Sequence, residues 1–395
     1  MELVDIALAA AGLPVLAASS YLAALALLSR RPAQPAGGTP RLKFDVIVPA
    51  HDEEAQIAAT VGSLRAVDYP SALFRILVVA DNCSDGTAAA AGAAGAAVLV
   101  RTDAERRGKG YALNHAFDRS LTDGFADVVV VVDADTVVSP NLLTAFAARF
   151  EAGALAVQAD YAVRNPRSSW RTRMMTVAFA AFHGVRSLAR ERLGVSCGLR
   201  GNGMGFASAV LRAHPHRAFS VVEDVEYGIQ LGYAGVPVRY VDEAHVFGQM
   251  VVGEHASRSQ RERWENGRSV LIRQHALPLL RAAWRRRDGL LLDLALDLLV
   301  PPLGELVAII TVGVIVCLVA GGAHHGVALW IWGAAAAGIV LHVGRAWVLS
   351  GVGPAGLLDL LFAPVYVVWK LTLRLRPGKR RPKDEWVRTT REAQR

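Results

Sequence analysis

The sequence predicts an α/β protein built on a doubly wound, mostly parallel sheet. N-terminal and C-terminal transmembrane helices and interfacial amphipathic helices are expected to flank it. Five consecutive valines, Val128–Val132, are typical of a strand buried on both faces at the centre of a parallel sheet. Strand and helix patterns alternate on either side of this run, which favours a doubly wound sheet. Apolar residues concentrate at 3–28 and again after 289, where membrane helices are expected.

Acidic residues follow three of the expected strands. Strands are predicted at 44–48, 76–80, 97–100 and 128–132, and helices at 55–66, from Gly108 onward and after Pro140. The carboxyl ends of parallel strands share one edge, where open α/β sheets bind their ligands. The acids at this edge are Glu53, Asp81, Asp133 and Asp135. They are therefore expected to converge on one cleft, although no G-x-G-x-x-G follows the first strand to indicate a dinucleotide site.

The pair Asp133 and Asp135 is the candidate metal site. Two carboxylates one residue apart at a strand end can turn toward one hard cation, which commonly also holds substrate phosphates. Acids after strands also serve as turn and capping residues, and this alternative stays open. The run Asp52–Glu54 could likewise only favour the start of a helix.

Three further segments surround this edge in the sequence. Gly108-Lys109-Gly110 opens a helix where a phosphate or a base edge could bind. The glycine-dense run Gly198–Phe206 predicts either an acceptor-side or nucleotide-side loop or an ordinary turn and strand. Glu223 and Asp224 open a predicted helix at 223–231, where dipole capping is the alternative role. An arginine-rich helix is expected at 168–192, packing against the core or a membrane surface.

Composition and charge distinguish a membrane-associated protein from a nucleic-acid-binding protein. The chain has 395 residues, 53% hydrophobic residues, a mean hydropathy of +0.30 and a formal net charge of +8. The arginines lie beside apolar segments, which favours an anionic membrane surface. The globular part lacks a basic patch interleaved with aromatics, so no nucleic-acid partner is expected. Three cysteines without metal-like spacing imply neither a disulfide framework nor a zinc site.

The apolar segments predict a membrane topology. Residues 6–28 carry no charge and exceed the roughly 20 residues that span a bilayer. A secretory signal is the alternative, but Arg30 and Arg31 follow the segment, which places the next domain in the cytoplasm. Spans are expected at 302–320 and 326–349, after an amphipathic helix at 290–300 with Asp293 and Asp297 on one face. One span before the cytoplasmic domain and two after it return the basic tail to the cytoplasm. A further span at 357–373 would place the tail outside, so this segment is expected to be interfacial or re-entrant.

Six segments resemble the inverting family 2 glycosyltransferases of the GT-A fold, and within them the membrane cellulose, chitin and hyaluronan synthase branch. The resemblance covers about residues 43–275. The segments are Pro49-Ala50-His51-Asp52-Glu53-Glu54, Asp81–Thr87, Gly108–Asn114, Asp133-Ala134-Asp135, Val222-Glu223-Asp224 and Gln260-x-x-Arg263-Trp264. The last segment is the most specific, because it matches the Gln-x-x-Arg-Trp motif of that branch in the expected order.

The resemblance implies roles for these residues. The donor, a UDP-sugar, would be held by Pro49, Ala50, Glu53, Asp81, Lys109 and Asp133, with Asp133 and Asp135 holding Mg²⁺ or Mn²⁺. Asp224 would be the catalytic base. Glu223, Gln260, Arg263 and Trp264 would bind the acceptor and the diphosphate. A single displacement with one base inverts the anomeric carbon.

The domain organisation expected from these patterns is multi-pass, with the catalytic domain on the cytoplasmic side of a bacterial inner membrane. The expected parts are an anchor at 1–29, a linker at 30–42, a catalytic domain at 43–280, an interfacial helix at 281–300, two spans at 301–350, an interfacial or re-entrant helix at 351–373 and a basic tail at 374–395.

The expected function is transfer of a hexose or N-acetylhexosamine to a membrane lipid or glycan, for the cell envelope or an exopolysaccharide. Processive synthesis of an extruded β-linked polymer is the alternative, and a non-catalytic membrane binding protein is the more remote one. Few polar residues are available in the spans to line a pore. A secreting synthase would therefore need an oligomer or a separate export partner.

Overall fold

A computed structural model of the chain describes residues 2–249, 254–321 and 326–360, and the side chains of Glu2, 254–266 and Gly321 are outside that description. The chain forms two compact units. One contains residues 31–165 and 193–295 and carries the sheet. The other contains residues 2–30, 166–192 and the helical region from residue 296 onward. Each unit is described by itself below.

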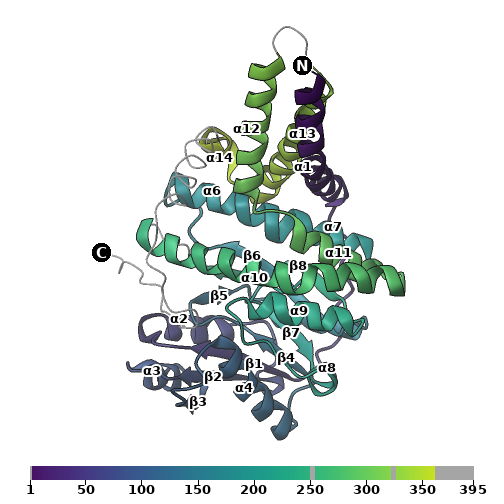
Figure 1. Ribbon diagram of the computed structural model, residues 1–395. Helices are drawn as coiled ribbons and strands as arrows, with labels where there is room; N and C mark the ends of the chain where they lie inside the picture. Colours follow the sequence, from purple (N-terminus) through teal and green to yellow (C-terminus); the bar gives the residue numbers. More distant parts are fainter. Residues whose placement is uncertain (1, 250–253, 322–325, 361–395) are drawn as a thin grey trace. The chain divides into compact units, whose positions relative to one another are not determined.

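The first half of the sheet is parallel, as the alternation of strands and helices predicts (Figure 1). Its strands lie in the order β3 (Ala97–Arg101), β2 (Phe74–Asp81), β1 (Phe44–Ala50) and β4 (Val128–Val131). β1 pairs with β2 on one side and with β4 on the other. All four residues of β4 are buried, which explains the run of valines.

The second half of the sheet is mixed rather than parallel. The order continues with β7 (Met204–Ala207), β6 (Ala156–Val163), β8 (Val238–Gly248) and β5 (Thr136–Val138). β7 runs antiparallel to both of its neighbours, β4 and β6, and β5 runs antiparallel to β8. Because β7 is reversed, the segment that leads into it lies at the edge where β4 ends. The glycine-dense run is therefore placed beside Asp133.

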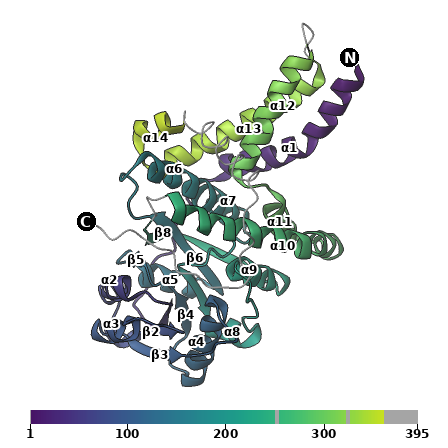
Figure 2. The same ribbon diagram turned by 60° about the vertical axis from the view of Figure 1, so that its left-hand side comes forward.

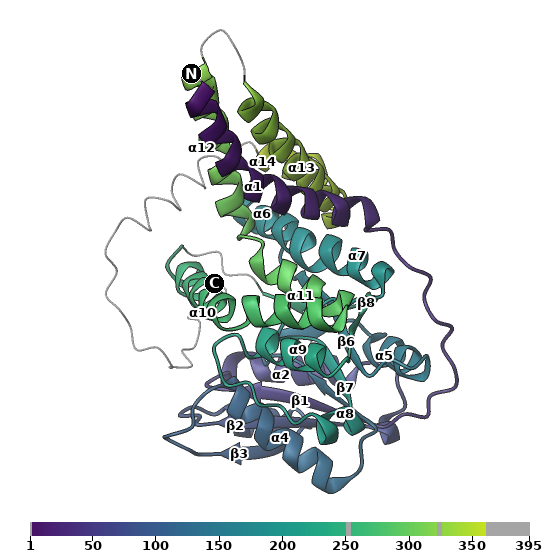
Figure 3. The ribbon, with the colours of Figure 1, turned by 45° about the vertical axis from the view of Figure 1, so that its right-hand side comes forward.

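Helices cover both faces of the sheet. Alternate strand residues, among them Val46, Val78 and Val130, join a core with α2 (Glu54–Arg65), α3 (Thr87–Ala93) and α5 (Leu142–Glu151). The residues between them, such as Ile47 and Val129, are equally buried. They face the side where α4 (Lys109–Asp123) packs along β1 and β2 (Figure 3). The remaining elements of this unit are η1 (Ser71–Leu73), α8 (Ser208–Ala213), α9 (Glu223–Tyr233), α10 (Glu254–Arg286) and the start of α11 (Gly289–Leu299).

Three helices among the described residues are long and apolar enough to cross a membrane, within α1 (Glu2–Leu28), α12 (Leu303–Gly321) and α13 (Val327–Ser350). Figure 2 shows α1, α12 and α13 side by side. α1 and α13 run parallel, because the Asp5 carboxylate accepts hydrogen bonds from the first amides of α13 and the Arg345 guanidinium donates to the Ser29 carbonyl at the other end. Arg345 thus binds the end of α1.

The arginine-rich segment belongs to the same unit as the three candidate membrane helices. It consists of α6 (Trp170–Phe179), a π-helical turn η2 (Ala180–Val185) and α7 (Arg186–Leu193), where a single helix at 168–192 is expected. α6 and η2 pack against α13. Arg186 and Arg190, both buried, share an ion pair with the single carboxylate of Asp297. The sequence predicts packing against the core or a membrane surface, and the segment packs against the apolar helix α13.

Element boundaries near the C-terminal part differ in detail from the expected domain limits. α10 continues to Arg286, so the expected interfacial helix at 281–300 corresponds to α11 from Gly289. Residues 166–192, expected within the catalytic domain, group with the spans. α14 (Gly353–Leu360) begins the segment expected to be interfacial. Residues 361–373 and the basic tail lie outside the described residues.

Gly203→Ala should destabilise the fold more than Gly124→Ala. Both glycines have positive φ, which costs an alanine about 1–2 kcal/mol. At Gly203 a Cβ would also lie 2.9 Å from Val246, whereas nothing lies within 4 Å at Gly124. Thermal unfolding of the detergent-solubilised variants measures the difference. Equal shifts in Tm would show that the close packing at Gly203 relaxes without cost.

Candidate active site

Lys109 is the centre of the candidate site. It is the first residue of α4, after Gly108, whose φ of 132° is in a region that only glycine adopts readily. The Nζ of Lys109 donates to Oδ1 of Asp133 at 2.6 Å and to the carbonyl of Gly201. It also lies 3.6 Å from Oε1 of Glu223. One ammonium thus joins the end of β4, the loop before β7 and the start of α9.

The second glycine of the Gly-Lys-Gly segment allows a close approach of the backbone. A Cβ on Gly110 would lie 2.3 Å from the carbonyl oxygen of Ala218. The neighbouring Tyr111 ring stacks on Phe219, with centroids 4.4 Å apart. These contacts dock the segment before α9 on the first turn of α4. They bring Glu223 and Asp224 to the lysine.

Asn202 holds the turn that carries the paired aspartates, a role that the sequence patterns do not indicate. Its side-chain oxygen accepts a hydrogen bond from the Asp133 amide at 3.1 Å, and its Nδ2 donates to the hydroxyl of Thr136 at 2.8 Å. The residue is fully buried. Gln158 donates to the Asn202 carbonyl at 2.7 Å and so fixes the backbone of the loop. Only the density of glycines around Asn202 signals in the sequence that this loop approaches other backbone closely.

Gly201 brings the same loop against the first turn of α9. Its φ is +77°, and a Cβ there would lie 3.3 Å from Oδ2 of Asp224 and 3.6 Å from Nζ of Lys109. The expected turn and strand are present, and the expected acceptor-side or nucleotide-side role of the loop stays a prediction. The run forms a turn that leads into β7, and it also lines the candidate site.

Burial and the lysine set the protonation of the acids. Burial raises the pKa of Glu223 to about 7, and Lys109 opposes the shift. The pKa values of Asp133 and Asp224 are also raised, mainly by burial, and again Lys109 opposes the shift. Burial works against the charge on Lys109, but its carboxylate neighbours outweigh that effect and raise its pKa. The lysine is therefore charged, and it stabilises the ionised forms of the acids around it.

Asp81, at the end of β2, offers a buried carboxylate oxygen. Arg101 forms an ion pair with its Oδ1, while Oδ2 has no hydrogen-bond partner among the described residues. The residue is 1% exposed. Nδ1 of His51, after β1, donates a hydrogen bond to the Asp81 carbonyl at 2.8 Å. An unsatisfied buried carboxylate oxygen is costly, so this atom is a candidate acceptor for an N–H group of a ligand.

The residues that follow β1 lie beside those that follow β2. Pro49 and Ala50 pair with Val79 and Ala80 in the parallel register. The Glu53 amide donates to the hydroxyl of Thr87 at 2.8 Å. Glu53 occupies the N-cap position of α2, but its side chain makes no capping hydrogen bond, so helix capping does not account for its carboxylate.

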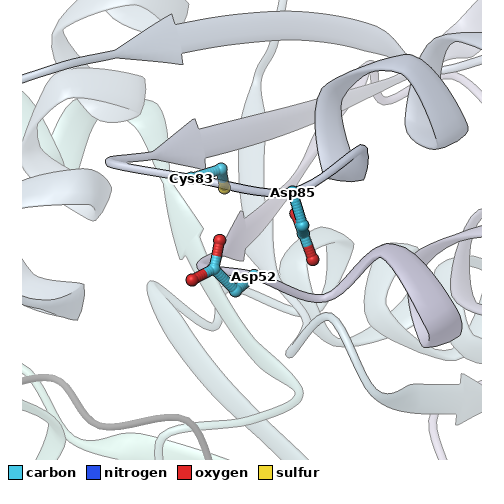
Figure 4. A group of neighbouring side chains, drawn as sticks. All are labelled: Asp52, Cys83 and Asp85. Atoms are coloured by element: carbon cyan, nitrogen blue, oxygen red, sulfur yellow. The ribbon is translucent and has the colours of Figure 1, made fainter.

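Asp52, Cys83 and Asp85 form a separate cluster in these two loops (Figure 4). Among the residues that the structure describes, this is the group whose potential metal-ligand atoms lie within 4.8 Å of one another. Asp52 already accepts from the amide and hydroxyl of Ser84, and Asp85 accepts from Thr87. Burial raises the pKa of the Cys83 thiol, which disfavours the thiolate that a metal needs. The hydrogen bonds of this cluster therefore hold the two loops together. We take the acids around Lys109 as the stronger candidates for chemistry.

The side chains of Gln260, Arg263 and Trp264 lie outside the described residues, although their backbone belongs to α10. The next described position of this helix is informative. A Cβ on Gly267 would lie 2.9 Å from Val222, the residue before Glu223. α10 thus passes close to the start of α9.

Comparisons with known proteins identify the class. A family model described as glycosyltransferase like family 2 matches residues 40–267, more than half of the chain. The chain belongs to this family, and the fold and the acids at the carboxyl edge of its sheet agree with a glycosyltransferase domain. The specific resemblance to polysaccharide synthases remains a proposal, taken up below.

Individual relatives are more distant. A probable glycosyltransferase of Bacillus subtilis (strain 168), YdaM, is 24% identical over 241 residues, and the match covers 58% of this chain and 56% of that protein. This chain thus spans little more than half the length of that curated relative. The solved mannosyltransferase PcManGT from Pyrobaculum calidifontis, in complex with GDP-Man and Mn²⁺, is similar in fold. It has a TM-score of 0.53 and 20% identity, with 93% of this chain and 99% of that one covered.

Asn202→Ala should destabilise the protein by about 1–3 kcal/mol, because the Asp133 amide loses its acceptor and the buried Thr136 hydroxyl loses its donor. Asn141→Ala is a matched control. That asparagine donates one hydrogen bond, to the Glu243 carbonyl, outside the candidate site. Thermal unfolding compares the two variants. An Asn202→Ala shift no larger than that of the control would mean that the Asp133 turn holds its shape without Asn202.

Proposed function

We propose that this family 2 glycosyltransferase moves a hexose or N-acetylhexosamine, with inversion, from a UDP-sugar to a membrane-associated lipid or glycan acceptor. The product would serve the cell envelope or an exopolysaccharide. The observation that carries the proposal is the convergence of Asp133, Glu223 and the Gly201 carbonyl on Lys109, with Asp224 against the same loop. The ammonium at the carboxyl edge of the sheet suits the negative charge that develops on a leaving diphosphate, and the acids beside it can hold a divalent cation with the same effect.

The donor base and ribose are assigned to the ends of β1 and β2. The partnerless Oδ2 of Asp81 can accept the imide N–H of uracil, and guanine offers a similar N–H. Glu53, which follows β1 at the start of α2, is assigned to the ribose hydroxyls. Pro49 and Ala50 would supply the wall of this pocket, because both belong to the buried end of β1.

The diphosphate is assigned to Asp133, Asp135 and Lys109. Two carboxylates from one turn form a hard oxygen donor set, which fits Mg²⁺ or Mn²⁺. PcManGT holds GDP-Man and Mn²⁺ in a similar fold, which makes a nucleotide sugar with a divalent cation the first class to test. When bound, the cation neutralises the charge of the departing diphosphate. Lys109, at the start of α4, adds a second positive charge beside the same phosphates.

Asp224 is the proposed base. Burial raises the pKa of its carboxyl, so it takes a proton from an acceptor hydroxyl more readily than an exposed aspartate does. Glu223 lies beside it and faces Lys109. Glu223, Gln260, Arg263 and Trp264 are proposed to hold the acceptor and the diphosphate, with Arg263 suited to phosphate and Trp264 to a sugar face.

The membrane arrangement proposed is multi-pass in a bacterial inner membrane, with the catalytic unit in the cytoplasm. The parallel packing of α1 and α13 supports it, because both helices then cross in the same direction. Arg30 and Arg31 follow α1 directly, as the positive-inside rule expects of a cytoplasmic end.

Processive synthesis of a β-linked polymer is the second candidate. The Gln260-x-x-Arg263-Trp264 segment favours it, since the segment resembles the motif of polymer synthases. The three candidate spans are nearly all apolar and offer few groups for a wet channel. A single or short transfer is therefore preferred. Polymer export would require an oligomer or a separate partner.

The full-length protein in nanodiscs should release UDP from one member of a panel of UDP-sugars, with GDP-mannose included as the alternative donor. EDTA and Asp135→Ala should each abolish release, because the diphosphate charge is left uncompensated. Mass spectrometry of the product at excess donor separates one or two added sugars from a polymer ladder. Full activity in EDTA would reject the metal assignment, and inactivity with every donor would reject the proposed donor class.

Asp224→Asn should abolish turnover and leave UDP affinity within about threefold of the wild type, since a base is lost while the donor site remains. Isothermal titration with UDP and Mn²⁺, beside the turnover assay, checks both quantities. Asp118→Asn, a change on α4 outside the proposed site, should alter neither. If Asp224→Asn weakened UDP binding as much as it slowed turnover, Asp224 would be a donor ligand instead.

A further inference from the structure

We propose that Lys109 is a built-in counter-ion that competes with the divalent cation for Asp133 and gives it up when a nucleotide diphosphate binds. The inference rests on the proposed function, because it takes Asp133 and Asp135 as the cation ligands. It adds an order to the binding events. The cation alone would bind weakly, and the diphosphate would make its binding tight.

The first observation is that the lysine occupies one of the proposed ligand atoms. Nζ of Lys109 lies 2.6 Å from Oδ1 of Asp133, a charge-assisted hydrogen bond. A cation that used this oxygen would have to replace the ammonium or share the carboxylate with it. Sharing would bring like charges together between partly buried side chains, where their repulsion is less screened than on an exposed surface.

The second observation is that the ammonium is held by the protein and is not a freely solvated surface group. Its side chain is 17% exposed, and it also donates to the Gly201 carbonyl. Glu223 lies 3.6 Å away, and Gly201 approaches both Nζ of Lys109 and Oδ2 of Asp224. The resting site is therefore a compensated cluster of acids with its own cation. An added cation must disturb this cluster.

The third observation is that the lysine can move toward a phosphate with little rearrangement. It is the first residue of α4, where backbone amides and the helix dipole favour an anion. A lysine is a compact charge on a flexible stem, so its ammonium can turn from a carboxylate to a phosphate without moving the backbone. A diphosphate would thus offer Lys109 a new partner and release Asp133 for the cation.

The consequence is a coupling between the two ligands through Lys109. The diphosphate promotes cation binding both by direct coordination and by removing the competing ammonium. By reciprocity the cation promotes diphosphate binding to the same degree. Removing the ammonium should therefore tighten binding of the cation alone and reduce the additional gain from UDP.

The test is Mn²⁺ binding to the full-length protein in nanodiscs, followed by electron paramagnetic resonance with and without UDP. Lys109→Met should bind Mn²⁺ alone roughly tenfold more tightly than the wild type, because a nearby like charge is gone. It should also show a smaller gain in Mn²⁺ affinity on addition of UDP. Lys109→Arg, which keeps the charge, should stay within about threefold of the wild type. Lys43→Met loses the same charge beside the Phe125 ring, outside the site, and should match the wild type.

Unchanged or weaker binding of Mn²⁺ alone to Lys109→Met would overturn the proposal. If that variant does not fold, Glu223→Gln and the double variant Lys109→Met with Glu223→Gln give the same comparison with one buried carboxylate fewer. Tighter Mn²⁺ binding in the double variant supports competition, and equal binding refutes it. The turnover assay keeps the two proposals apart. UDP release with unchanged Mn²⁺ affinity rejects only the counter-ion role, whereas the Mn²⁺ effect without release from any donor rejects only the proposed donor class.

Discussion

The candidate site depends on one partly buried ammonium held among carboxylates. An ammonium at the position of Lys109 would be costly without acids around it, and the acids would be costly without a cation. The lysine therefore requires that α4, the end of β4, the Gly201 loop and the start of α9 all meet at one place. The glycines at 110 and 201 serve this requirement, because side chains there would contact the segments that must approach. The chemistry and the local packing are thus two aspects of the same electrostatic constraint.

Much of this arrangement follows from local patterns in the sequence. The valine run, the spacing of strands and helices, and the acids at the strand ends predict the parallel half of the sheet and which edge carries Asp81, Asp133 and Asp135. These features depend on residues close together along the chain and on a general rule for parallel strands. The reversed strand β7 has four residues, too few to reveal its direction. The place of Asn202 depends on that direction, so its contact with Asp133 could not be predicted from the sequence.

In the apolar helices, too, some features could be predicted from the sequence and others could not. Their extents follow from hydrophobicity alone, and the spans agree with the expected segments to within a few residues. Their polar contacts join residues more than 300 positions apart, as between Asp5 and Val327 and between Ser29 and Arg345. No local sequence pattern predicts such a pair. The π-helical turn η2 could not be predicted from the sequence either, since it occurs where the helix packs against α13.

The division of the chain also limits how this enzyme can be dissected. The catalytic sheet is not one continuous stretch, because residues 166–192 leave it between β6 and β7 and belong to the unit of the spans. A water-soluble fragment cut only at its two ends would retain that segment, with its apolar surface stripped of its partners and prone to aggregate. A short polar linker from residue 165 to residue 193 would remove it. The loop with Gly201 and Asn202 follows the junction within ten residues, so the linker length would also set how well the active site forms.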